Sequence, residues 1–115
     1  MEDLDVGLMR GTLDLLILKA VSWGPRHGYA IAEWIEQVSG EVLLVGEGTL
    51  YPALHRLEKQ GLVETEWGLS ENNRQAKYYR LSSDGRRRLK VGTSSWRDFV
   101  EAAGRALSAT GPVPA

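Results

Sequence analysis

The stretch GEGTLYPALHRLEKQGLV, residues 46–63, places its leucines at helical spacing. When it is wound at about 100° per residue, Leu50, Leu54 and Leu57 fall on one side of a helix. A helix of this pattern buries its apolar side against the rest of a domain. We therefore expect a helix over residues 49–60 whose leucines contribute to the core.

Residue types mark both ends of this helix. Thr49 is expected to be its N-cap, because a hydroxyl accepts a hydrogen bond from a first-turn N–H group. Pro52 then falls among the first three helical positions, where a missing N–H costs no hydrogen bond. Gly61 is expected to end the helix, since glycine adopts the left-handed conformation of a helix stop.

The other side of the helix is aromatic and basic. We call it the ridge, and it consists of Tyr51, Pro52, His55, Arg56 and Lys59. An α-helix fits the major groove of DNA, where polar side chains reach base edges and cations neutralise phosphates. Two positions have an alternative interpretation: Tyr51 only packs against the first helix, and His55 is an ordinary exposed residue.

Two helices precede this segment and a hairpin follows it. Apolar periodicity predicts helices over residues 11–23 and 27–40. Period-two alternation predicts strands over 62–67 and 77–81, joined by a polar loop at 68–75. The expected fold is mainly α with a two-stranded β wing, a winged helix-turn-helix. Trp23, Trp34 and Trp67 are expected in the core or at its rim.

Charge is distributed unevenly along a chain whose net charge is only −1. Residues 1–73 hold twelve acids and five bases, whereas residues 74–90 hold seven bases and only Asp84 as an acid. A solvated surface explains most such runs. Arg74 and Lys77 nevertheless lie on the predicted wing, where a cation can follow the DNA backbone.

A long helix is expected over residues 83–108, with Ser82 as its N-cap. At about 1.5 Å per residue it would be roughly 39 Å long, too long for one small domain to cover. Gly85 and Gly92 weaken a helix interior, so close packing or local irregularity is expected there. Its apolar seam predicts a second copy of the chain as partner and consists of Leu89, Trp96, Phe99, Val100, Ala103 and Leu107.

Several classes of function are excluded or disfavoured by composition. The 115 residues contain no cysteine, so disulfides and thiolate metal sites are ruled out. The only histidines, His27 and His55, stand in no catalytic or metal-binding pattern, so we expect neither an enzyme nor a cofactor. The acidic start and the interrupted apolar runs favour a cytoplasmic protein without a membrane span.

Four motifs together resemble the PadR family of bacterial transcriptional regulators. They are GPRHGYAI (24–31), GTLYPALHRLEKQGLV (48–63), KYYRL (77–81) and SSDGRRRL (82–89), and the resemblance covers roughly residues 8–100. It implies a homodimeric, usually repressing, DNA-binding protein that is often released by a small phenolic or drug-like effector. The short C-terminal segment resembles the smaller subgroup of the family. The sequence departs from the family pattern at Ser82, the first residue of the last motif, where threonine is usual.

The resemblance also implies roles for individual positions. The recognition helix would be the segment 49–60, with Tyr51 as the DNA-contacting tyrosine, while Trp96 of both protomers and Phe99 could line a slot for an aromatic effector. The candidate DNA contacts are therefore Thr49, Tyr51, Pro52, His55, Arg56, Lys59, Arg74 and Lys77.

These predictions combine into one organisation. Residues 8–82 form a DNA-binding domain, 83–108 a dimerisation helix and 109–115 a disordered tail. The expected function is sequence-specific regulation of transcription through duplex DNA with an inverted-repeat operator. The alternative is a winged helix that docks another protein and binds no DNA.

Overall fold

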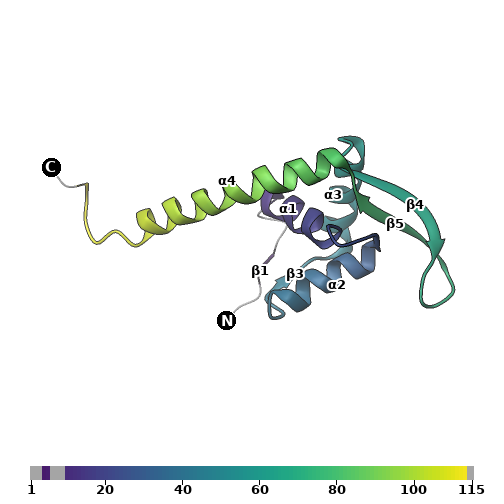
Figure 1. The fold of residues 1–115 in the computed structure, drawn as a ribbon. Coiled ribbons are helices and arrows are strands. Elements are labelled where there is room, and N and C mark those ends of the chain that lie inside the picture. The colour runs from purple at the N-terminus through teal and green to yellow at the C-terminus, as the bar shows by residue number, and fades with distance from the viewer. Residues whose placement is uncertain (1–3, 6–9, 114–115) are drawn as a thin grey trace.

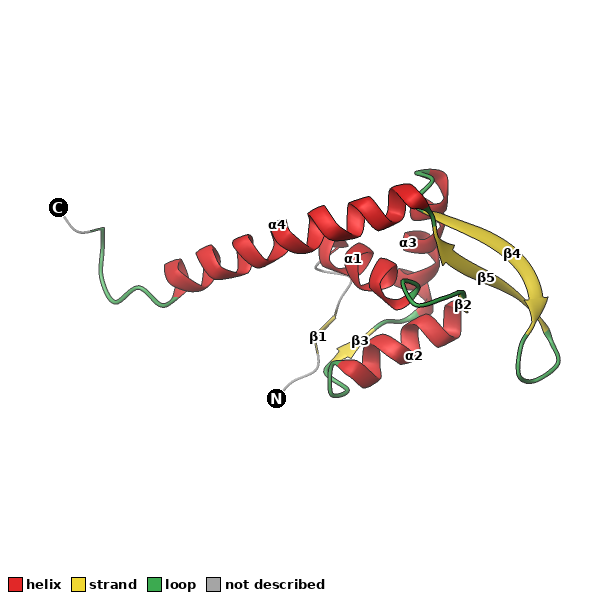
Figure 2. Cartoon of the chain, in the orientation of Figure 1, coloured by secondary structure: helices red, strands yellow, loops and turns green. Residues whose placement is uncertain are grey.

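The computed structural model describes residues 4–5 and 10–113, and its elements are labelled in Figure 1. Helices and strands are distinguished in Figure 2. In chain order the elements are β1 (Leu4–Asp5), α1 (Arg10–Ala20), β2 (Arg26–His27), α2 (Gly28–Val38), β3 (Leu43–Leu44), α3 (Glu47–Lys59), β4 (Val63–Leu69), β5 (Gln75–Leu81) and α4 (Ser83–Leu107).

The predicted wing is present as the antiparallel pair β4 and β5, with Val63 opposite Leu81 and Leu69 opposite Gln75. The connecting turn has five residues, 70–74, so the expected eight-residue loop is wrong because both strands continue further than their strict alternation suggested. The short strand β2 adds a third member to this sheet, and β1 pairs with β3 in parallel. Neither two-residue pairing was expected from the sequence.

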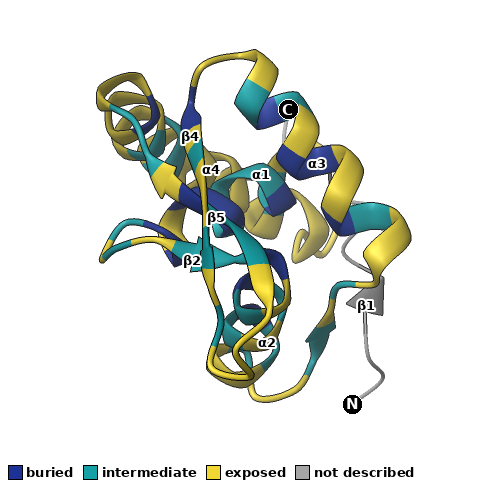
Figure 3. Ribbon diagram, turned by 90° about the vertical axis from the view of Figure 1, so that its right-hand side faces the viewer, coloured by how far each residue is buried: buried dark blue, intermediate teal, exposed yellow. Residues whose placement is uncertain are grey.

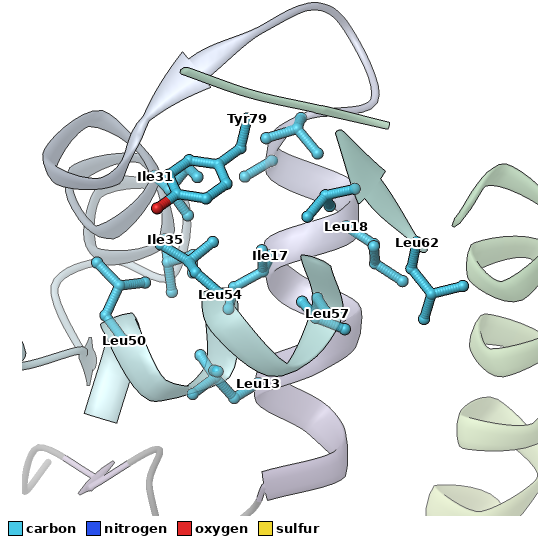
Figure 4. Packing of buried hydrophobic residues seen from close by; sticks show 14 residues of the cluster. Leu13, Ile17, Leu18, Ile31, Ile35, Leu50, Leu54, Leu57, Leu62 and Tyr79 are labelled. Atoms are coloured by element: carbon cyan, nitrogen blue, oxygen red, sulfur yellow. The ribbon is translucent and has the colours of Figure 1, made fainter. Parts of the chain in front are cut away.

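The core lies between the three short helices and the base of the wing. Leu50, Leu54 and Leu57 of α3 are buried there, as predicted, together with Tyr79 of β5. Figure 4 shows these side chains converging with the isoleucines and leucines of α1 and α2. Burial raises the pKa of the Tyr79 phenol. The leucine side of α3 thus fixes which of its faces is turned outward.

The start of α3 differs from the prediction. Gly46 is the N-cap, and its carbonyl accepts hydrogen bonds from the N–H groups of Thr49 and Leu50 at 3.1 and 2.9 Å. Thr49 is therefore a helical residue, so its expected role as cap is wrong. Pro52 is the sixth residue of α3 and removes one intrahelical hydrogen bond, whose acceptor would be the carbonyl of Gly48, an exposed residue.

The end of α3 follows the prediction in detail. Gly61 adopts a left-handed conformation with φ +73°. The N–H of Leu62 donates to the carbonyl of Leu57 and that of Gly61 donates to Glu58, both at 3.0 Å. These two bonds form a Schellman motif, which satisfies the last carbonyls of the helix and turns the chain into β4.

The start of α4 is held against this same turn. The hydroxyl of Ser82 accepts from the N–H of Gly85 at 2.9 Å, which confirms the predicted cap. It also donates to the carbonyl of Gly61 at 2.6 Å, while the Ser82 N–H donates to the Leu62 carbonyl at 3.1 Å. Two of these hydrogen bonds, from Ser82 to the carbonyls of Gly61 and Leu62, thus join the start of α4 to the turn that ends α3.

The predicted close packing at the two glycines of α4 is present. A Cβ atom on Gly85 would lie 2.0 Å from the carbonyl oxygen of Leu62, and one on Gly92 would lie 2.5 Å from the Leu15 side chain of α1. In Figure 1, α1 lies beneath the first half of α4, whereas the second half extends away from the wing. The predicted tail is described only for residues 109–113, which have no regular secondary structure.

Candidate nucleic-acid interface

One side of α3 faces solvent, as the sequence predicted. Tyr51, Pro52, His55 and Lys59 are exposed along it, while Thr49 is half-buried at its start. In Figure 3 the exposed positions form the outer side of α3 and its buried positions face the interior. Four of the five ridge residues are therefore available to a partner.

Tyr51 has a packing role in addition to its exposure. Its side chain is 45% exposed. Its ring lies directly over Gly28 at the start of α2, where an added Cβ would come within 2.8 Å of the ring carbon Cε1 and of the phenol oxygen. The contact is with α2 rather than with the first helix. Gly28 therefore allows the Tyr51 ring to approach α2 closely while the side chain stays partly exposed.

Arg56 does not belong to the free ridge. Its Nη2 donates to Oδ1 of Asp14 on α1 at 2.5 Å, and the two side chains are only 23% and 26% exposed. The prediction of an outward Arg56 is wrong in this respect, because helical periodicity assigns a direction to the side chain but cannot identify a carboxylate on another helix. The pair joins α3 to α1.

Lys77 is likewise engaged within the chain. Its Nζ donates to Oε1 of Glu58 on α3 at 3.0 Å, and the hydroxyl of Thr65 on β4 donates to the other carboxylate oxygen at 3.0 Å. These bonds, from Lys77 first and Thr65 second, lower the pKa of Glu58. Lys77 thus fastens the base of the wing to α3, and its predicted contact with DNA stays a prediction.

The far end of the wing carries side chains that the prediction placed elsewhere or overlooked. Arg74 is exposed at the turn, as expected. Trp67 and Leu69 on β4 are also exposed, and so is Trp23. The prediction that the tryptophans lie in the core or at its rim is therefore wrong for Trp67 and Trp23, whereas Trp34 packs against the core. Trp67, Tyr51 and Arg74 line one concavity of about 580 Å³ between the wing and the start of α2. The sequence did contain a signal that β4 extends beyond Trp67, because the period-two alternation continues through Trp67 to Leu69.

The seam predicted on α4 is mostly uncovered within one chain. Its exposed members are Trp96, Phe99, Val100 and Leu107, whereas Leu89 and Ala103 are partly buried. The Trp96 indole N–H donates to the Thr12 hydroxyl of α1 at 3.2 Å. Beside this contact α1 and α4 enclose a groove of about 620 Å³, lined in part by Leu15, Leu16 and Trp96.

Other kinds of site were searched for in residues 4–5 and 10–113. This part of the chain contains no group of three or more histidine, aspartate or glutamate residues that could hold a metal ion. In the same residues, no helix is long and apolar enough to cross a membrane.

Comparison with known proteins gives consistent matches. The sequence model of the transcriptional regulator PadR-like family matches residues 17–91. Protein X of Lysinibacillus sphaericus, which is uncharacterised, is 32% identical over 94 residues, covering 82% of this chain and 86% of that protein.

Two solved structures extend the comparison to the fold. A transcriptional regulator from Clostridium thermocellum is 30% identical, with a TM-score of 0.77 over 85% of this chain and 95% of that chain. A PadR family transcriptional regulator from Eggerthella lenta is 32% identical, with a TM-score of 0.75 over 90% of this chain and 88% of that chain. The winged architecture and the long last helix are therefore shared with solved regulators.

Proposed function

This chain belongs to the PadR-like family of transcriptional regulators, and on that premise we propose that it is a homodimeric repressor that binds an inverted-repeat operator. The family consists of regulators, so the chain is a DNA-binding regulator rather than an enzyme. The proposal adds the dimer, the repression and the residues that contact DNA.

The observation that carries the proposal is the free side of α3. Tyr51, Pro52, His55 and Lys59 form a continuous exposed surface on a helix whose other side is fixed in the core. An α-helix presented in this way fits the major groove. Lys59 supplies a cation for phosphate, and Arg74 does so at the wing turn. Arg56 and Lys77 instead hold α3 in place through their carboxylate partners.

The dimer is supported by the uncovered half of α4. Phe99 is 65% exposed, and Val100 and Leu107 are exposed beside it. A contiguous apolar surface of this kind marks an interaction site. Residues 83–108 thus serve as the dimerisation helix and residues 8–82 as the DNA-binding domain, of which residues 8 and 9 lie outside the described part of the chain.

The apolar lining supports a second copy as the occupant of the groove between α1 and α4. The groove is lined in part by Leu15 and Leu16. The distal half of α4 carries the exposed apolar residues Phe99, Val100 and Leu107. If two α4 helices run antiparallel, each distal half lays this apolar surface over the groove of the other protomer. The dimer would then present two α3 helices with two-fold symmetry.

An aromatic effector would bind where the two α4 helices meet. Trp96 offers a ring face beside the groove, and Phe99 lies one turn further along. Paired aromatic residues suit a flat apolar ligand. Quenching of tryptophan fluorescence by a planar aromatic compound, lost in Trp96→Phe, is the expected result. Equal quenching in both proteins would remove this site.

The experiment on DNA compares two neighbouring cations of α3. Selection from a random duplex pool should first yield a two-fold symmetric sequence. Lys59→Ala should then lower the slope of log affinity against log salt by about 0.9 for each lost phosphate contact, at unchanged stability. Arg56→Ala is the matched control, because it should lower the free energy of unfolding by roughly 1 kcal/mol and leave the slope unchanged.

The outcomes separate the possibilities. A smaller slope in Arg56→Ala would mean that Arg56 leaves Asp14 to reach a phosphate. No enrichment of any duplex, or binding that ignores salt, would favour the winged helix as a protein-docking module.

A further inference from the structure

An exposed aromatic surface lies where α1 is followed by α2. Trp23 in this turn is 65% exposed, and its ring centroid lies 5.6 Å from that of Trp34 on α2. Trp34 packs partly against the core, whereas Val38, one turn further along α2, is 60% exposed. We call these three residues the tryptophan patch. Large apolar side chains gathered on the surface in this way mark an interaction site.

The tryptophan patch adjoins one end of the groove between α1 and α4. The Lys19 ammonium lies 4.8 Å from the centroid of the Trp23 ring. Lys19 also lines the groove, together with Arg86 near the start of α4. The other end of the groove is marked by the hydrogen bond from Trp96 to Thr12. A segment that follows the groove toward the start of α4 therefore leaves it beside the patch.

In the proposed dimer the end of the partner's α4 lies at this place. The two α4 helices meet at Trp96 and run antiparallel, so positions equally far before and after Trp96 lie level with each other. Leu107 is eleven residues after Trp96, and Gly85 is eleven residues before it. The α4 helix of the partner therefore ends beside Gly85 and Arg86, at the end of the groove that adjoins the tryptophan patch.

The segment that follows α4 has the chemistry of a ligand for aromatic surfaces. Residues 108–113 read SATGPV and contain neither helix nor strand. Pro112 is exposed, and Val113 is 91% exposed. Proline-containing segments bind aromatic-lined surfaces in the polyproline II conformation, and their restricted backbone loses little entropy on binding. The segment thus matches the patch in chemistry.

Reach decides which chain supplies this segment. Ser108 lies 22 residues beyond Arg86, which is about 33 Å along α4 at ~1.5 Å per residue. Residues 108–113 span only about 20 Å when fully extended. They cannot return to Trp23 of their own chain, and Figure 1 shows them beyond the far end of α4, away from the wing. The partner's segment, in contrast, begins level with Arg86 and is close to the patch from its first residue.

We propose that residues 108–113 of each protomer bind the tryptophan patch of the other, with Pro112 against the ring of Trp23. This inference rests on the proposed function, because it requires the dimer, and it adds a contact outside the apolar seam of α4. By two-fold symmetry the contact occurs twice in each dimer. Both copies lower the dissociation constant of the dimer.

The first test measures the dissociation constant of the dimer by sedimentation equilibrium. Removal of residues 108–115 and Trp23→Ala should each weaken the dimer roughly tenfold, as loss of an aromatic anchor does. The two changes combined should weaken it no further, because each removes the same contact. Trp67→Ala is the matched control, since Trp67 is 67% exposed but lies on the wing. Additive losses, or an equal loss in the control, would overturn the inference.

The second test shows which chain supplies the segment. A chain that ends at Leu107 is labelled with fluorotryptophan, and its Trp23 signal in fluorine NMR is assigned with Trp23→Phe. Excess unlabelled full-length chain should move this signal to its position in the labelled full-length dimer, because protomers exchange. Unlabelled Pro112→Asp is the control and should leave the signal where it is. A signal that the unlabelled full-length chain does not move contradicts binding between protomers.

Failure of this inference is distinct from failure of the proposed function. If the chain that ends at Leu107 dimerises as strongly as the full-length chain, the tail contact is ruled out and the seam of α4 remains the interface. If the full-length chain stays monomeric at every concentration, both are ruled out.

Discussion

Gly85 is the residue whose identity the packing restricts most closely. It is buried in the first turn of α4, and a Cβ atom there would meet the carbonyl oxygen of Leu62 and the side chain of Leu81. The carbonyl belongs to the backbone and already accepts a hydrogen bond from Ser82, so it cannot move aside cheaply. Glycine is therefore required here for close approach.

We predict that Gly85→Ala lowers the free energy of unfolding by about 1–3 kcal/mol, the usual cost of overpacking. Gly104→Ala is the control in the same helix. Because nothing lies within 4 Å of an added Cβ there, the higher helix propensity of alanine should raise stability by up to about 1 kcal/mol. Urea unfolding of both variants measures the difference. Similar values for the two would show that the contact at Gly85 relaxes easily.

Single residues also show what the sequence could and could not predict. The three leucines of α3 were assigned correctly, because burial of an apolar side follows from helical period alone. Arg56 and Lys77 were placed on the DNA-facing surface, yet each has a carboxylate partner far away in the chain. No local pattern indicates that Asp14 or Glu58 will lie beside them. The tertiary fold creates those pairs.

At the scale of elements, a local sequence pattern again does not indicate tertiary contacts, and this explains the errors at strand and helix ends. The wing and the long helix were predicted because each has many residues in one period. Strand β2 has two residues, Arg26 and His27, and exists only because β5 lies beside it. The N-terminus of α3 was misplaced because glycine at position 46 caps the helix without a side-chain acceptor, whereas Thr49 has the residue type of a cap.

The connection between α3 and the wing predicts a dependence of stability on pH. The pKa of Glu58 is lowered from its ordinary value of 4.5 by Lys77 and Thr65. The stabilisation by this carboxylate is therefore fully present above about pH 4.5 and is lost as the pH falls through its lower folded-state pKa. Because the side chain is about one-third exposed, the effect is expected to stay below about 1 kcal/mol.

The measurement compares urea unfolding from pH 7 to pH 3 in three proteins. Glu58→Gln should be less stable than wild type at pH 7, and the difference should vanish at the acidic end. Glu101→Gln serves as control, because Glu101 is an exposed carboxylate paired with Arg105 on α4. A difference that stays constant across this range would mean that the amide disturbs packing and that the ion pair has no measurable role.

At the scale of the whole molecule, the proposed dimer depends on the uncovered half of α4. Phe99→Asp should yield monomers in sedimentation, because a carboxylate would have to be desolvated in the dimer seam. DNA affinity should fall with it, since a monomer contacts only one half-site. Arg105→Glu is the control, and it changes the charge of the helix more than Phe99→Asp does. Because residue 105 lies roughly 120° around the helix from Phe99, this variant should remain dimeric. A stable Phe99→Asp dimer would place the interface elsewhere.

The hydrogen bonds around Ser82 have a mechanical consequence. Since they join the end of α3 to the start of α4, the two helices turn together rather than separately. Helix α4 is about 37 Å long at ~1.5 Å per residue, and in the proposed dimer it would act as a lever arm with its pivot at the far end. A tilt of roughly 5° at that pivot would swing the tip of the arm by about 3 Å. A small rearrangement between protomers would thus change the separation of their two α3 helices without unfolding any element.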